Sequence, residues 1–171
     1  GAGGPDQSWD LVSGTVGALA AALAVDDGTG TETVEAIARR VRAQSPLFDA
    51  DTAYTGYAHG AVGAASVLLR AGAHLDDSGL AAAGSHLLRR VMSTRRETGW
   101  PRTFAADDRT AGHAWCHGST GMLLAAAEAH AIDADLVSSA QLVELSRGVL
   151  AEGLGNNPAL CHGDAGTIDV L

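Results

Sequence analysis

The sequence predicts an all-α fold, an α/α toroid in which inner and outer helices form two layers around one axis, here as an incomplete ring. Two observations lead to this prediction. A Gly-x-x-Gly element recurs four times along the chain, and two kinds of helix-forming segment alternate between its copies. No segment of the 171 residues has the pattern of a strand ladder, so a sheet is not expected.

The Gly-x-x-Gly copies lie roughly fifty residues apart, which leaves room for two helices and two loops in each repeat. The first three run on into Ala, Leu and Val sequence that is apolar nearly all round. Because a helix without a polar face is buried on every side, each copy predicts the start of an inner helix. The four copies are residues 13–17, 59–63, 117–121 and 162–166.

An amphipathic segment follows each of the first three inner helices. In residues 34–42 the apolar side chains between Val34 and Val41 share one helical face, and arginines occupy the other. The same pattern fits residues 80–96 and 142–149, and these three segments predict the outer helices. Their predicted N-caps are Thr31 or Thr33, Ser78 and Asp133.

The remaining segments are loops and an N-terminal segment that has no apolar pattern. Residues 1–8 predict a linker or disordered start, and residues 9–171 predict one partial domain. Four inner starts and three outer helices make only part of a ring, so we expect further chain or a neighbour to complete it. By its length, the loop 98–115 is a candidate for a substrate-facing wall.

The charge and cysteine content exclude several classes of protein. The chain has 11 basic residues, all arginine, against 20 acidic ones, and its net charge of -9 argues against nucleic acid as a partner. The longest weakly polar run, Thr15 to Val25, is too short to span a membrane. Two cysteines do not make a disulfide scaffold, and no signal-peptide pattern is present, so we expect a cytoplasmic protein.

Both cysteines lie in a metal-site pattern. Each is followed by a histidine and then by a Gly-x-x-Gly copy, at Cys116-His117 and at Cys161-His162. Zinc prefers four tetrahedral ligands, and Cys116, Cys161 and His162 supply three of them and leave one position open. Adjacent ligands need a sharp backbone turn, which Gly163 permits. The alternative is that the two cysteines are small buried residues.

A zinc ion held by two thiolates suits a sulfur substrate, because such a site activates a bound thiol for attack on an electrophile. His59 and His117 occupy the same repeat position as the predicted ligand His162, and Asp10 precedes the first inner helix. His59, His117 and Asp10 are therefore the candidates for catalysis. Their alternatives are a core histidine for His59, a helix cap for His117 and a terminal charge for Asp10. The other histidines hold no repeat position and are expected to be solvated or structural.

The motifs at residues 10–17, 58–63, 115–118 and 160–166 resemble those of the lanthionine synthetase C-like cyclase family, in order and roughly in spacing. The family's toroid has seven inner and seven outer helices, so the resemblance covers about half of it. It implies a zinc-dependent cyclase that adds cysteine thiols of a dehydrated precursor peptide to dehydroalanine or dehydrobutyrine, giving thioether rings.

The resemblance also implies residue roles. Cys116, Cys161 and His162 match the family's zinc ligands, and His59 and Asp10 match a histidine and an aspartate that manage protons. His117 stands where stand-alone cyclases usually carry tyrosine. A histidine at this position, together with the Leu-Cys-His-Gly-Asp motif that starts at Leu160, is similar to the cyclase domains of bifunctional class II or class IV synthetases. This similarity implies that the remainder of a larger synthetase chain is a partner.

One family position departs from the pattern. Stand-alone cyclases place an arginine four residues before the first zinc cysteine, and Gly112 stands there in this chain. Arg109 is the candidate replacement. Two other functions stay open: addition of glutathione to dehydroamino acids on the same scaffold, and a non-catalytic fragment that binds zinc or a peptide.

Overall fold

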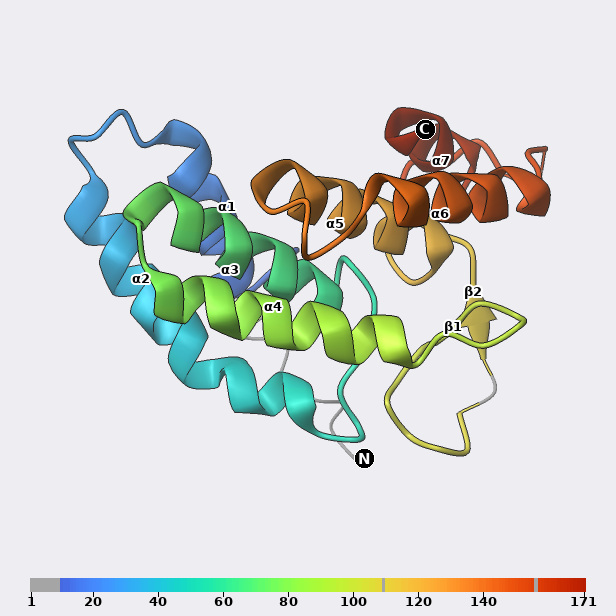
Figure 1. The fold of residues 1–171 in the computed structure, drawn as a ribbon, viewed down its shortest axis with the longest axis horizontal. Coiled ribbons are helices and arrows are strands. Elements are labelled where there is room, and N and C mark those ends of the chain that lie inside the picture. Colours follow the sequence, from blue (N-terminus) through green and yellow to red (C-terminus); the bar gives the residue numbers. More distant parts are fainter. Residues whose placement is uncertain (1–9, 109, 156) are drawn as a thin grey trace.

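The computed structural model describes residues 10–108, 110–155 and 157–171. The predicted linker at residues 1–8 and the candidate Arg109 lie outside these described residues. In the described part the chain forms two layers of helices, and the prediction of an all-α arc of a toroid is confirmed (Figure 1). The inner helices are α1 (Thr15–Val25), α3 (Ala61–Leu75), α5 (Ser119–Ile132) and α7 (Asp164–Val170). The outer helices are α2 (Thr31–Gln44), α4 (Ser78–Ser93) and α6 (Ser139–Glu152).

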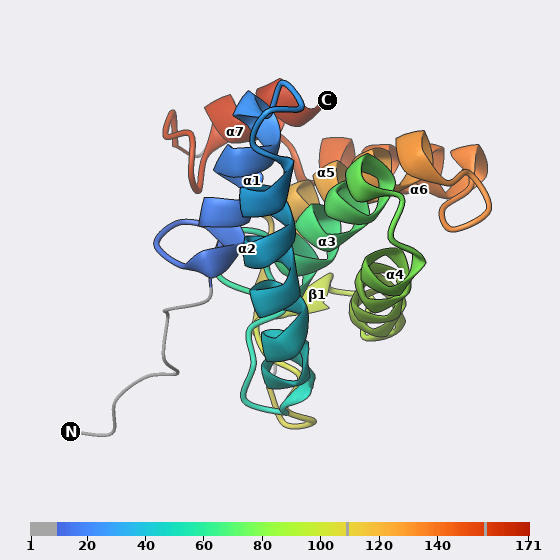
Figure 2. The same ribbon diagram turned by 90° about the vertical axis from the view of Figure 1, so that its left-hand side faces the viewer.

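The inner helices lie side by side in chain order, with α3 between α1 and α5, and α7 beyond α5. Each outer helix covers an inner one: α2 packs on α1 and α3, α4 on α3, and α6 on α5 (Figure 2). Two glycines bring α3 and α4 close together. A Cβ at Gly84 of α4 would lie 2.8 Å from the carbonyl oxygen of Ala65, and a Cβ at Gly72 of α3 would lie 2.7 Å from the backbone nitrogen of Ala81.

How far each inner helix is buried depends on how many helices surround it and not on how apolar its sequence is. Most of α3 is buried, because other helices surround it. The expectation that the first three inner helices are buried on all sides is wrong for α1, which contacts fewer helices than α3 does in the described part. On α1 only Val16 and Leu19 are buried. Val25 at the end of α1 is 80% exposed, and Ile168 on α7 is 61% exposed.

All four inner helices begin where the repeats predict, with the first glycine of each Gly-x-x-Gly copy at the N-cap. The predicted caps of the outer helices are wrong by one to five residues. Gly30 caps α2. Asp77 caps α4, because its carboxylate accepts from the amides of Gly79 and Leu80. Ser138 caps α6 in a capping box with Gln141.

The loop between α4 and α5 contains a short strand pair. Strand β1 (Trp100–Pro101) pairs antiparallel with β2 (Ala111–Gly112), and Trp100 lies opposite Gly112. The hairpin is tied to the loop before α3 by Thr55, whose amide donates to the carbonyl of Arg102 at 3.0 Å. A short 3-10 helix, η2 (Ser45–Asp49), follows α2. None of the described helices has the length and apolarity needed to cross a membrane.

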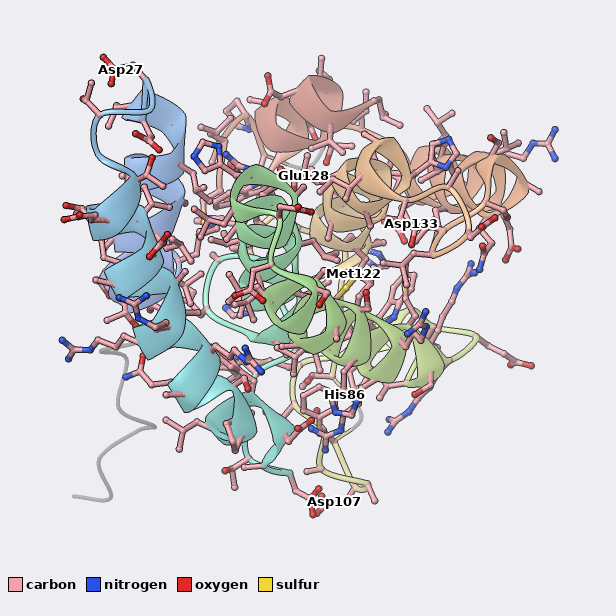
Figure 3. The ribbon with its side chains drawn as sticks, turned by 60° about the vertical axis from the view of Figure 1, so that its left-hand side comes forward. Asp27, His86, Asp107, Met122, Glu128 and Asp133 are labelled. Atoms are coloured by element: carbon pink, nitrogen blue, oxygen red, sulfur yellow. The ribbon has the colours of Figure 1, made fainter. Side chains whose placement is uncertain are left out.

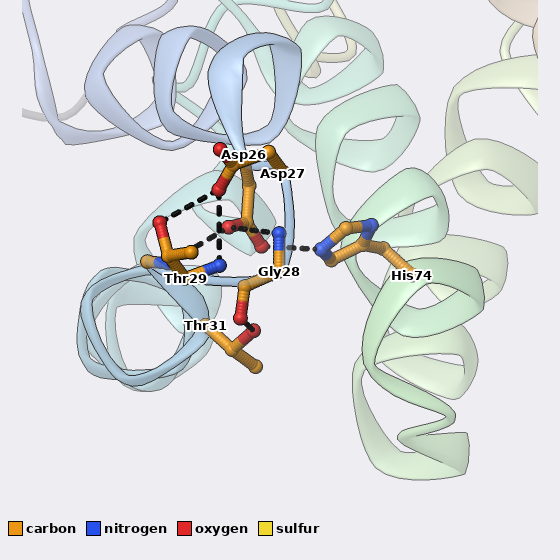
Figure 4. Close-up of polar contacts among 7 residues, drawn as sticks. Asp26, Asp27, Gly28, Thr29, Thr31 and His74 are labelled. Carbon is orange, nitrogen blue, oxygen red and sulfur yellow. Dashed lines mark hydrogen bonds and ion pairs between the residues drawn. The ribbon is translucent and has the colours of Figure 1, made fainter.

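Histidines without a repeat position pair with oxygen atoms of other residues, as expected for structural residues. His74 near the end of α3 pairs through Nε2 with Asp26 at 2.8 Å, and Asp26 also accepts from the amides of Gly28 and Gly30 (Figure 4). This contact ties the loop between α1 and α2 to α3. His130 donates from Nδ1 to the carbonyl of Val137 at 2.7 Å.

One carboxylate lies between two inner helices. Glu128 of α5, which is labelled in Figure 3, accepts a hydrogen bond from the Tyr57 hydroxyl at 2.9 Å and another from the Ser66 hydroxyl of α3. Burial, and then the charge of Glu128, raise the pKa of Tyr57 well above its usual 10. The Tyr57 ring also lies 5.5 Å from the ring of Trp115, which precedes Cys116. Tyr57 therefore links the α3–α5 interface to the loop that carries Cys116.

Candidate metal centre

Three backbone hydrogen bonds join the loops that precede the four inner helices. The amide of Leu11 donates to the carbonyl of Ala58 at 3.1 Å, and the amide of Ala58 donates to the carbonyl of Cys116 at 3.2 Å. The amide of Cys116 in turn donates to the carbonyl of Cys161 at 3.2 Å. Since each loop leads directly into an inner helix, this series brings the candidate residues of all four repeats to one end of the arc.

The second glycine of each repeat allows its loop to fold back on the helix that follows. A Cβ at Gly17, Gly63, Gly121 or Gly166 would lie only 1.9–2.2 Å from the carbonyl oxygen six residues earlier. The role predicted for Gly163 needs a correction. Its φ of -148° is extended backbone that any residue adopts, and a Cβ there would instead lie 2.1 Å from the carbonyl oxygen of Asn157. The repeats thus need glycine for close backbone approach.

The structure brings together the three residues that the sequence predicts as metal ligands. One ligand atom from each of Cys116, Cys161 and His162 lies within 4.8 Å of the other two. Cys116 is buried, whereas Cys161 and His162 are not. Tetrahedral zinc with Zn–S bonds of about 2.3 Å separates two sulfur ligands by about 3.8 Å. The three ligand atoms would therefore need to move only slightly closer together to bind a zinc ion.

The electrostatics of the two thiols also fit a cation. Burial, and then the neighbouring Cys161, raise the pKa of the Cys116 thiol to about 11. Two thiolates this close repel each other, so both ionise readily only when a positive charge lies between them. A coordinated metal ion supplies that charge. The cluster can thus supply three ligands to a metal ion, whereas two free thiolates side by side would be unfavourable.

Asp10 and His59 form a pair beside this cluster. Oδ2 of Asp10 lies 2.9 Å from Nδ1 of His59, and the Asp10 side chain is only 1% exposed. Oδ1 accepts from the amide of Ser13 at 2.6 Å and from its hydroxyl at 3.0 Å. Burial opposes ionisation of Asp10, but the hydrogen bonds from His59 and Ser13 outweigh it and hold the pKa below 3.8. Asp10 is therefore an anionic partner for His59 at neutral pH.

His117 lies next to His59 and is not part of the ligand cluster. The rings of the two histidines are 5.3 Å apart, and the ring of Tyr54 lies 5.7 Å from His117 on another side. Burial, and then the positive charges of Arg102 and His59, lower the pKa of His117 to about 4. Its buried Nδ1 has no hydrogen-bond partner among the described residues. His117 is therefore neutral at pH 7 and has a free nitrogen.

A cavity of about 430 Å³ opens onto the cluster. Cys116, His117 and His162 line one side of it, and Trp100 and Arg102 of the hairpin region line another. The loop 98–115 therefore forms part of the wall of this cavity, and its role toward a substrate stays a prediction. Sequence reasoning missed Arg102, because no motif marks it. The sequence feature that could have pointed to Arg102 is its position in the long loop 98–115.

These features define a protein of the α/α-toroid class with a Cys, Cys, His cluster at one end of its inner helices. A model of the family described as lanthionine synthetase C-like protein matches residues 4–171. The chain therefore belongs to the lanthionine synthetase C-like family, as its motifs predicted.

A solved structure has the same fold. The chain superposes on nisin cyclase with a TM-score of 0.74 at 17% sequence identity. The match covers 95% of this chain and 50% of nisin cyclase, so the chain spans half the length of that protein. A comparison with curated protein sequences finds no match.

Proposed function

We propose that this chain is part of a zinc-dependent cyclase that joins cysteine thiols of a dehydrated precursor peptide to dehydroalanine or dehydrobutyrine residues. The observation that carries the proposal is the position of Cys116, Cys161 and His162, whose ligand atoms lie within 4.8 Å of one another. Family membership supports the same reaction. Zinc bound at these residues supplies a Lewis acid that lowers the pKa of a substrate thiol.

The reaction requires one proton to leave the thiol and one proton to reach carbon. The thiolate sulfur forms a bond to Cβ of the dehydroamino acid, and the electron pair of the Cα=Cβ double bond moves onto the carbonyl oxygen as an enolate. A proton then adds to Cα and the carbonyl bond forms again, so the peptide mass is unchanged. A protein acid and base are needed at both proton transfers.

The Asp10–His59 pair is suited to this proton handling. Because the Asp10 carboxylate is anionic and accepts from Nδ1 of His59, the neutral imidazole carries its proton on Nδ1 and leaves Nε2 free. The His59 side chain is 29% exposed, and its ring lies 5.3 Å from the ring of His117, which lines the cavity. We assign the proton transfers to His59, with Asp10 as its orienting partner and neutral His117 as the group between His59 and the cavity.

The proposed partners are the dehydrated precursor peptide and the remainder of a larger synthetase chain. The cavity of about 430 Å³ is suited to a peptide segment, since it is open and lined by polar and apolar groups. Apolar side chains exposed on α1 and α7, such as Val25 and Ile168, support further helices as neighbours of this arc. The cytoplasmic location stays a prediction.

The test is to incubate the complete native polypeptide and zinc with a dehydrated peptide that contains one cysteine and one dehydroalanine. We expect loss of the free thiol, measured by alkylation, without a change of peptide mass. Glutathione is added in a parallel reaction. A glutathione adduct in place of the ring would support the glutathione alternative, and zinc binding without loss of thiol would support the non-catalytic one.

A further inference from the structure

Among the described residues, Arg102 brings a guanidinium group to the cavity at the metal cluster. This residue directly follows β1, and it lines the cavity together with Cys116, His117 and His162. Its backbone is held in place by Thr55. The amide of Thr55 donates to the carbonyl of Arg102 at 3.0 Å, and the hydroxyl of Thr55 donates to the carbonyl of Pro101 at 2.5 Å. Since Thr55 is buried, the base of the Arg102 side chain has a fixed position at the cavity wall.

The charge of Arg102 is not neutralised within the described part of the chain. No described carboxylate lies within 4.0 Å of its guanidinium, whereas Arg39, Arg90 and Arg95 each form an ion pair. The guanidinium lies 5.3 Å from the ring centroid of Tyr54, a contact that orients a cation without using its N–H donors. No carboxylate is found among the described residues that line the cavity. The donors of Arg102 are therefore available to a ligand.

The opposite strand has no room for a side chain at Gly112, which lines the same cavity. A Cβ at Gly112 would lie 1.9 Å from the carbonyl oxygen of His117, so the backbone of His117 occupies the space that a residue there would need. Gly112 pairs with Trp100, two residues before Arg102. Among the described residues of this hairpin, the cation at the cavity therefore comes from the β1 side.

We propose that Arg102 is a catalytic residue that hydrogen-bonds the carbonyl oxygen of the dehydroamino acid and stabilises the enolate formed when sulfur bonds to Cβ. This inference rests on the proposed function. The addition step moves negative charge onto the carbonyl oxygen, and a guanidinium at the cavity wall can donate hydrogen bonds to that oxygen and stabilise the charge. Arg102 takes no proton itself, because its guanidinium stays protonated. The charge is relieved when Cα is protonated and the carbonyl bond forms again.

The test compares Arg102→Gln and Arg102→Lys with the wild type in the complete native polypeptide. Arg147→Gln is the control, because it removes the same charge from an exposed position on α6 that does not line the cavity. Cyclisation rates are measured on a peptide with one cysteine and one dehydroalanine. Binding is measured separately on the same peptide with serine in place of cysteine, which forms no ring. Zinc content and the circular dichroism spectrum are recorded for every variant.

We expect Arg102→Gln to lower kcat about 100-fold, as for loss of an oxyanion donor, and to change peptide affinity less than about threefold. Arg102→Lys should recover about tenfold of that loss, because it restores a cation without the planar donors. Arg147→Gln should match the wild type, and zinc content should be equal throughout. An Arg102→Gln protein with wild-type kcat overturns the inference, as does a loss confined to peptide affinity. A wild type that leaves the thiol intact overturns the proposed function, and the Arg102 role with it.

Discussion

Replacing Asp10 with asparagine tests the buried pair at the base of the site. The Asp10 carboxylate accepts two hydrogen bonds from Ser13, at 2.6 and 3.0 Å, and pairs with Nδ1 of His59 at 2.9 Å. An asparagine side chain keeps one acceptor oxygen for Ser13, and its NH2 group pairs with His59 only when the imidazole moves its proton from Nδ1 to Nε2. The substitution thus either replaces the charged pair by a neutral hydrogen bond or leaves a donor without a partner, and we expect it to cost about 1–3 kcal/mol of the free energy of unfolding.

The assay is thermal unfolding followed by circular dichroism, in which each kcal/mol corresponds to about 2–4 °C for a domain of this size. Asp107→Asn is the matched control, because Asp107 is exposed at the edge of the molecule (Figure 3). The folded pKa of Asp10 lies below 3.8, so its contribution is present above the unfolded pKa. It is lost as the pH falls through the folded pKa. Equal unfolding temperatures for Asp10→Asn and the wild type at pH 7 would refute the buried pair.

Two further tests concern the packing around the site, and the first of them uses a pair of glycine substitutions. Gly121→Ala places a methyl carbon 2.2 Å from the carbonyl oxygen of Trp115 and should cost at least about 1–3 kcal/mol in a thermal melt. Gly148→Ala, in the open middle of α6, should instead gain about 0.5–1 kcal/mol, and equal effects of the two would contradict the close approach. Glu128→Gln removes a charge beside Tyr57, so the raised pKa of that phenol should fall toward 10 in an ultraviolet titration. An unchanged titration would show that the two groups are not in contact.

The inner helices could be predicted because their signal is local and repeated. Each begins one residue after the first glycine of a Gly-x-x-Gly copy, and the same close approach recurs at the second glycine in all four copies. One physical requirement, a carbonyl oxygen packed against a glycine, therefore marks every inner start. The meeting of Cys116, Cys161 and His162 follows from these starts.

Features that depend on distant or competing contacts could not be predicted. Ser78 and Asp133 have capping side chains, but Asp77 and Ser138 make the caps, because each has an amide partner within reach. The exposure of α1 depends on which helices surround it, which its apolar sequence does not encode. The place of Arg102 at the cavity depends on the β1–β2 pair and on Thr55, which is 47 residues away along the chain.

The metal content of single-residue variants tests the central claim most directly. The complete native polypeptide, purified with zinc at micromolar supply, should contain about one zinc ion per chain. Cys116→Ala, Cys161→Ala and His162→Ala should each lose it, while His117→Ala should keep it, because His117 lies outside the ligand cluster. A well-folded wild type without zinc would contradict the account, as would a Cys161→Ala protein that retains zinc as tightly as the wild type.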